Sequence, residues 1–320
     1  MRSPQYISPS SFAQWKKDQE EYYVRYLADN RPPRDPQTLP MSIGSAFDAY
    51  VKAEINARLN GDAGKTELSF ENLFERSVEK QNRDTAKVDG LRVFQLYESS
   101  GALAELISQI YSDVRMEFEV QGMVPSNRNS GLVLMGKPDL SFKTKEGKHI
   151  LLDWKVNGAY SQNHTSPMKG YVGLRGKDGS HFKCHKDAQL GRWHGIRFNM
   201  ASTLEFLNET WAQQMAIYAW LCGEPIGGDF LAMIDQIVGR LGEQKIAEHR
   251  VTVGRTFQFG LDNDLHDMWS VIRSEHIFRD MTLEDSQARC KLLDMMYVEQ
   301  SAEDEDMFKS MKPNVFKGTF

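Results

Sequence analysis

The sequence predicts an α/β fold in which a central sheet follows a helical cap at the N-terminus, with more helices at the C-terminus. Three observations predict it. Helical periodicity dominates the first third of the chain, short runs typical of strands fill the middle, and helical patterns return at the end. Because strands and helices do not alternate one by one, a fold of repeated βαβ units is excluded.

Composition places the chain among ordinary globular proteins. Its 320 residues are 40% hydrophobic and 26% charged, with a formal net charge of −5, which excludes disorder along its whole length. No apolar run approaches the roughly 20 residues that a membrane-spanning helix needs, and the N-terminus has no signal-peptide core, so we expect a cytoplasmic protein. The cysteines are too few for a disulfide scaffold: Cys184, Cys222 and Cys290.

Residues 1–112 are predicted to form the helical cap. Ser8 is a suitable N-cap for the first helix, because Pro9 then occupies the first helical position, where its missing N–H costs no hydrogen bond. The prolines between residues 31 and 36 end that helix. Helices are expected over 8–28, 43–59 and 67–112, the last divided near 89–90 and 99–101.

Residues 113–260 are predicted to form the core. The run HILLDW at 149–154 is apolar up to a charged end, as in a central strand, and RMEFEV at 115–120 alternates as a half-buried strand does. A clear amphipathic helix is predicted at 204–221. Strands are expected over 115–120, 131–135, 139–142, 149–154, 229–238 and 245–253.

The end of the chain is predicted to add two helices and a tail. The helices occupy residues 261–298, over about 261–280 and 283–298, and residues 299–320 follow as a flexible tail. The tail combines an acidic run with a basic, aromatic end. Two interpretations stay open for it: a disordered, solvating end, or a docking segment for a partner such as a single-strand-binding protein or a recombinase.

Two aspartates carry the first sign of chemistry. Asp139 ends the segment GKPD at a turn into a strand, and Asp153 ends the apolar strand at 149–154. The spacing allows two antiparallel strands and a hairpin, which would bring both carboxylates to one end of a sheet. Two carboxylates that close favour a cation between them, and such oxygen ligands suit Mg²⁺ or Mn²⁺.

Three further side chains complete this candidate site. Lys155 lies two residues after Asp153 on the strand, so both side chains point to one face. A lysine beside a metal-ligating carboxylate can activate the attacking water or neutralise charge that develops on phosphorus. Gln214 and Tyr218 are four residues apart on the predicted helix, share a face, and can donate hydrogen bonds to a phosphate or to the carboxylates.

These motifs resemble the core of the PD-(D/E)XK nuclease superfamily. Asp139 followed by Asp153-x-Lys155 resembles its signature, and the Gln214-x-x-x-Tyr218 helix resembles the RecB-like branch. The resemblance implies a restriction-endonuclease-like core, in which helices flank a mixed central sheet. That branch includes the nuclease domains of bacterial recombination helicase-nucleases, CRISPR-associated Cas4-type exonucleases and many phage exonucleases.

Two segments of the cap extend the resemblance. The segment ISPSS at 7–11 is similar to the Ser-Pro-Ser opening of the family, and GSAFD at 44–48 matches its Gly-x-x-x-His motif. Asp48 stands where the family has a metal-ligating histidine. An aspartate is also a suitable ligand for Mg²⁺.

The resemblance implies phosphodiester hydrolysis with one or two Mg²⁺ (or Mn²⁺) ions. Asp48, Asp139 and Asp153 would be metal ligands together with the Trp154 carbonyl, and Lys155 would be the catalytic lysine. Some relatives add a glutamate, for which the candidates are Glu117 and Glu119. An iron–sulfur cluster, present in many relatives, is excluded within one chain because it needs four cysteines.

Residues 157–206 are predicted to be an insertion with a local positive charge. The segment contains seven Lys and Arg residues but only three Asp and Glu residues, which would favour binding to phosphates. Its aromatic residues could stack on unpaired bases. It is either a DNA-contacting insertion or an ordinary solvated loop. The sequence His181-x-x-Cys184-His185 is a weak zinc signal, since a second ligand pair is missing.

The leading hypothesis is therefore a Mg²⁺-dependent DNA exonuclease that acts on single strands or free ends. By resemblance it would serve phage-type recombination, replication or repair, in the host cytoplasm if a phage encodes it. Two alternatives remain: a structure-specific or restriction-type endonuclease on the same core, and an inactive nuclease fold that only binds DNA or a partner. No membrane partner is expected.

Overall fold

Seven strands form the central sheet of the computed structural model. Their order is β1 (Ser112–Met116), β4 (Leu140–Lys143), β5 (His149–Asn157), β8 (Leu231–Val238), β9 (Lys245–Val251), β7 (Arg192–Gly195) and β6 (His185–Asp187). Neighbouring strands are antiparallel except for the parallel pairs β5/β8 and β9/β7. The sheet is thus mixed, as predicted. Strands β2 (Val120–Met123) and β3 (Val133–Gly136) form a separate two-stranded sheet.

The structure describes most of the chain up to residue 274. The described residues are 4–28, 34–61, 64–126, 128, 130–157, 185–187, 192–195, 203–238 and 245–274. The predicted helix at 283–298, the tail at 299–320 and most of the basic insertion therefore lie outside them. Within the described part, no helix is both long and apolar enough to cross a membrane.

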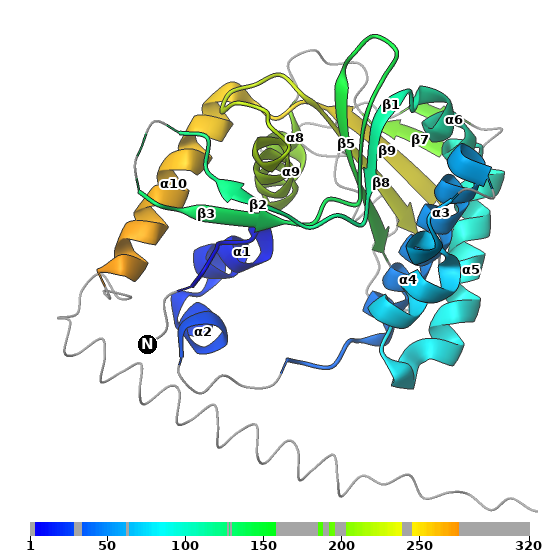
Figure 1. Cartoon of the computed structure of the whole chain (residues 1–320), viewed down its shortest axis with the longest axis horizontal. Coiled ribbons are helices and arrows are strands. Elements are labelled where there is room, and N and C mark those ends of the chain that lie inside the picture. The colour runs from blue at the N-terminus through cyan, green and yellow to red at the C-terminus, as the bar shows by residue number, and fades with distance from the viewer. Residues whose placement is uncertain are drawn as a thin grey trace, which may run out of the picture. The chain divides into compact units, whose positions relative to one another are not determined.

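Helices cover both faces of the sheet (Figure 1). On one face lie α3 (Leu39–Asn60), α4 (Phe70–Ser77), α5 (Arg83–Ser99) and α6 (Ala102–Gln109), with the short 3₁₀ turns η3 (Thr66–Leu68) and η4 (Lys80–Asn82) between them. The other face carries α8 (Leu204–Leu207) and α9 (Glu209–Leu221). The main core fills the first of these interfaces, with members such as Phe47 of α3, Val93 of α5 and Leu152 of β5.

The chain divides into two compact units. The larger takes in residues 36–129 and 134–262, so the helices α3 to α6 belong to the same unit as the central sheet. The smaller takes in the remaining described residues: those up to 35, residues 130–133 and those from 263 onward. Residues 112 and 113, between which the sequence analysis places a domain boundary, both lie in the larger unit.

The first predicted helix is confirmed at its start and broken near its middle. Ser8 caps α1 (Pro9–Lys17) in a reciprocal capping box with Ser11. Asp18 then ends α1 in an extended conformation and caps α2 (Gln19–Tyr22) with its own side chain. A π-helical turn, η1 (Tyr23–Leu27), completes the segment. The single helix expected over 8–28 is therefore wrong, because an aspartate serves both helix ends.

Other element boundaries also differ from the sequence expectation. Helix α3 begins at Leu39, four residues before the predicted start, with a proline in its first turn. Asn208 separates α8 from α9 and caps the latter. Helix α10 (Arg255–Arg273) begins six residues early and passes from the larger unit into the smaller.

Helix α9 is buried rather than amphipathic. Its residues 215–220 are all buried in sequence, and these six positions point around the whole helix circumference. The predicted amphipathic pattern is wrong because α9 is buried around its whole circumference over residues 215–220. Burial of this kind restricts the positions of the polar side chains that the helix carries.

The predicted break near Asp89-Gly90 is also wrong, because α5 runs through it. Gly90 permits close packing instead: a Cβ atom there would lie 2.5 Å from Ala46 Cβ and 3.0 Å from Phe47 N on α3. The glycine sets the distance between α3 and α5, and α3 carries part of the candidate site.

Gly90→Ala should lower the free energy of unfolding by about 1–3 kcal/mol, because the two helices must separate to admit the methyl group. Gly260→Ala is the matched control, since Gly260 is also helical and has nothing within 4 Å of an added Cβ. The control should be neutral or stabilising by up to about 1 kcal/mol. Urea unfolding measures both, and equal effects would contradict the packing role.

A second buried feature is a charged network between β8, β9 and α5. Arg250 forms ion pairs with Asp235 (2.5 Å) and Glu248 (3.0 Å), and the Tyr97 hydroxyl donates a hydrogen bond to Asp235 (2.5 Å). Tyr97, Asp235 and Glu248 are buried in the larger unit, and the Arg250 side chain is 11% exposed. His249, next to Arg250, is 1% exposed, and its Nδ1 has no hydrogen-bond partner. Desolvation, together with the neighbouring charge of Arg250, lowers the pKa of His249 to about 4.

His249 should therefore reduce stability in mild acid. The unfolded chain binds a proton near pH 6.5 and the folded chain near pH 4, so stability is lost as the pH falls between these values, by up to about 3 kcal/mol. His249→Gln should lose less stability than the wild type between pH 7 and pH 5. Thermal melting across this range tests the expectation, and parallel pH profiles for the two proteins would refute it.

Candidate active site

The antiparallel hairpin β4–β5 brings the two predicted aspartates to one end of the sheet. Leu140 pairs with Leu152, so Asp139, just before β4, and Asp153, just after Leu152, lie across from each other. Asp139 Oδ2 also accepts a hydrogen bond from the main-chain N–H of Trp154 at 3.0 Å. The predicted hairpin and the common end of both carboxylates are confirmed.

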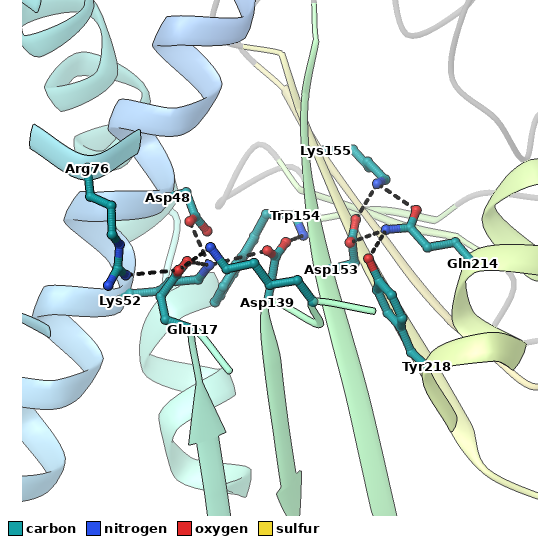
Figure 2. A network of polar contacts seen from close by, with 11 residues as sticks. Asp48, Lys52, Arg76, Glu117, Asp139, Asp153, Trp154, Lys155, Gln214 and Tyr218 are labelled. Atoms are coloured by element: carbon teal, nitrogen blue, oxygen red, sulfur yellow. Dashed lines mark hydrogen bonds and ion pairs between the residues drawn. The ribbon is translucent and has the colours of Figure 1, made fainter. Parts of the chain in front are cut away.

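Asp153 belongs to a compact group with Lys155 and α9 (Figure 2). Lys155 Nζ lies 2.5 Å from Asp153 Oδ2 and donates to Gln214 Oε1 at 3.0 Å. The Gln214 amide nitrogen lies 2.9 Å from Asp153 Oδ1 and 3.0 Å from the Tyr218 hydroxyl. The structure thus joins Asp153, Lys155, Gln214 and Tyr218, from two elements that are far apart in the sequence.

Gly136 leaves the space that the Tyr218 ring occupies. A Cβ atom at this position would lie 2.7 Å from two carbons of the Tyr218 ring and 3.0 Å from Leu221. The glycine of the GKPD segment therefore lets α9 approach β3 closely. The same segment ends in Asp139, so one turn positions both a carboxylate and the helix that carries Gln214.

Asp48 faces a lysine that the sequence analysis did not single out. Helix α3 presents Asp48 and Lys52 on one face, four residues apart, and Lys52 Nζ lies 2.6 Å from Asp48 Oδ2. The same ammonium group lies 3.2 Å from Asp139 Oδ1 and contacts Glu117. Its side chain is only 2% exposed. Lys52 thus connects carboxylates from three elements, as Figure 2 shows.

Glu117 interrupts the strand expected over 115–120. Its φ of +52° is in the left-handed region, which side chains other than glycine rarely adopt, and it separates β1 from β2. That expectation of one strand is therefore wrong. The turn directs the Glu117 carboxylate to Lys52, Lys137 (2.6 Å) and Arg76 (3.1 Å). Glu119, the other glutamate candidate, is exposed.

Burial and charge together shift the ionisation of this group. Desolvation raises the pKa of Asp153 to about 6 although Lys155 opposes the shift, and desolvation likewise raises the pKa of Asp48 against Lys52. For Lys155, burial would lower the pKa, but Asp153 outweighs it and the pKa rises. The neighbouring lysines thus offset only part of the desolvation of Asp48 and Asp153. An added cation would favour the ionised form of both carboxylates.

The donor set fits a hard divalent ion in its chemistry. Asp48, Asp139, Asp153 and the Trp154 carbonyl offer only oxygen, and Asp48 Oδ1 is buried without a hydrogen-bond partner. A ready-made cage is not present, however. Among the residues that the structure describes, no group of three or more His, Cys, Asp or Glu side chains forms a metal site. The ammonium of Lys52 lies between three of the carboxylates instead.

Sequence reasoning missed three cations of this site. Lys52 is recognisable only from its helical spacing to Asp48, Lys137 lies within the quoted GKPD segment, and Arg76 gives no local signal. Within the basic insertion, the structure describes the backbone of β6 and β7 at the sheet edge and residues 203–206 at the start of α8. His181 and Cys184 of the weak zinc signal lie outside the described residues.

Comparisons with known proteins give distant structural similarity. No family model matches the sequence, and no curated protein matches it either. Among solved structures, a "Putative exonuclease" from Eubacterium rectale is 13% identical over 85% of this chain and 82% of that chain, with a TM-score of 0.42. The protein SSO0001 is 13% identical over 80% and 84%, with a TM-score of 0.26. At these TM-scores, neither similarity assigns an activity to this chain.

Proposed function

We propose that the chain is a divalent-metal-dependent deoxyribonuclease that hydrolyses phosphodiester bonds. One observation carries the proposal: a buried aspartate and a lysine share one strand face, and a helix-borne glutamine contacts both, at 2.5–3.0 Å. A second carboxylate, Asp139, stands across the hairpin. This arrangement supplies a charged oxygen for a metal ion beside a fixed ammonium group, and both can stabilise the charge that develops during in-line attack on a phosphodiester.

Each side chain has a distinct role in this proposal. Lys155, with its raised pKa, stays protonated, so its ammonium neutralises charge that develops on the phosphoryl oxygens and orients the attacking water. Gln214 holds Lys155 and Asp153 in register through its two ends. Because the Tyr218 hydroxyl can accept from Gln214, its own proton is available to donate to a phosphate oxygen.

Asp139 and Asp153, with the Trp154 carbonyl, would hold the ion, and Asp48 adds an oxygen on the α3 side. When bound, a divalent ion of this kind polarises the phosphate and lowers the pKa of a ligated water. The packing of Trp154 against Phe47 of α3, with ring centroids 6.4 Å apart, fixes the peptide that supplies the carbonyl. Action on DNA ends or single strands, and a role in phage-type recombination or repair, extend the proposal and are supported by the sequence motifs.

Asp153→Asn and Lys155→Met should each lower DNA hydrolysis in Mg²⁺ by on the order of 10³-fold, because each removes a charge that acts on the reacting phosphate. Lys143→Met is the matched control, since Lys143 lies on the adjacent strand and pairs with the exposed Asp113. Its activity should stay near that of the wild type. End-labelled DNA, incubated with Mg²⁺ or with EDTA, gives the rates. Wild-type cleavage in EDTA, or undiminished cleavage by Asp153→Asn, would contradict the proposal.

A requirement for DNA ends is expected if the protein is an exonuclease. A linear fragment should be degraded while a covalently closed circle of the same sequence stays intact over the same interval, as judged on a gel. Equal loss of circle and fragment would favour the endonuclease alternative. Binding of both without cleavage would indicate an inactive, DNA-binding nuclease fold.

A further inference from the structure

Lys52 is the most unusual charged residue of the larger unit. Its ammonium group is buried and forms ion pairs with three carboxylates: Asp48 at 2.6 Å, Asp139 at 3.2 Å and Glu117. These partners come from α3, from the turn before β4 and from the turn between β1 and β2. An ammonium centred between three oxygen ligands from separate elements occupies a position of the kind that a metal ion takes in other proteins.

The balance of charge around Lys52 is the second observation. Four carboxylates meet at the site, and four cations contact them directly. Lys52 and Lys155 are the inner pair, and Arg76 and Lys137 lie on Glu117 at the exposed side, where both are 53% exposed. The four acids and four bases sum to zero formal charge. One divalent ion can be balanced by a substrate phosphate, but a second ion beside the Lys52 ammonium would meet uncompensated repulsion.

Glu117 provides the third observation. Its left-handed backbone is a strained conformation, and such strain persists only when surrounding contacts impose it. Lys52, Lys137 and Arg76 are those contacts. These contacts hold the strained turn and bring a third carboxylate to the Lys52 ammonium group.

We propose that Lys52 is a built-in cation that takes the place of a second divalent ion, so that the site binds a single Mg²⁺ or Mn²⁺ ion between Asp139 and Asp153. This inference rests on the proposed function and deepens it. Lys52 is a positioning residue in this scheme: it holds Asp48, Glu117 and Asp139 in place without touching the substrate. Its removal would leave three carboxylates that can ligate an additional ion.

Counting bound ions tests the proposal without measuring catalysis. The probe is Mn²⁺ alone, added to metal-free protein and followed by electron paramagnetic resonance or calorimetry. We expect one bound ion in the wild type, one in the Lys143→Met control and two in Lys52→Met. The melting temperature of Lys52→Met in EDTA should fall below that of the wild type, and Mn²⁺ should raise it by more than it raises the wild type.

Each result decides the proposal. Two ions in the wild type would overturn it, and this count is informative even if Lys52→Met does not fold. Lys52→Gln, which keeps a polar side chain but no charge, provides a second variant, and one ion in a folded Lys52 variant would also overturn the proposal. In both cases the nuclease assignment stands. Absence of any bound ion in the wild type, together with absence of cleavage, would instead overturn the proposed function and this inference with it.

Discussion

The register of the β4–β5 hairpin is the constraint on which the candidate site depends. Leu140 pairs with Leu152 in the antiparallel hairpin. Asp139, just before Leu140, and Asp153, just after Leu152, therefore meet at the same end of the sheet. A slip by one residue would turn Asp153 toward the apolar core and Trp154 toward α9. The apolar residues of β5 oppose such a slip, so the same burial that stabilises the sheet also positions the carboxylates. The geometry of the candidate site therefore depends directly on the packing of the core.

Strand alternation then divides the chemistry between the two faces of β5. Asp153 and Lys155 point toward α9, where Gln214 bridges them, while Trp154 packs against Phe47 in the main core. A peptide that is anchored on one face presents charged side chains on the other. The helices on each side are held close by glycines, Gly90 between α3 and α5 and Gly136 beneath Tyr218. Close packing at these glycines therefore restricts the positions of the polar side chains on α3 and α9.

The sequence was sufficient where a local pattern decides the structure. It predicted the hairpin and the association of Asp153 with Lys155, because alternation and spacing fix strand faces, whereas the mixed sheet was implied by the family resemblance. It failed where tertiary contact decides. Gly90 resembles a helix break until α3 is seen to pack on it, and the left-handed Glu117 stands inside a strand-like alternation. Lys52 is an ordinary helix lysine in sequence, and only the fold brings Glu117 and Asp139 to it.

The larger unit contains two buried networks of charged side chains. Arg250 with Asp235 and Glu248 lies deep beside β8, and Lys52 with its three carboxylates lies at the sheet end. Buried ion pairs seldom add much stability relative to apolar packing, whereas losing one partner costs several kcal/mol. The presence of these networks is therefore not itself evidence of high stability, but the loss of one partner should be costly. The two networks differ in the elements that they join. Arg250 pairs with acids of β8 and β9, whereas Lys52 of α3 pairs with carboxylates of two turns. An ammonium group thus holds part of the carboxylate geometry of the candidate site together.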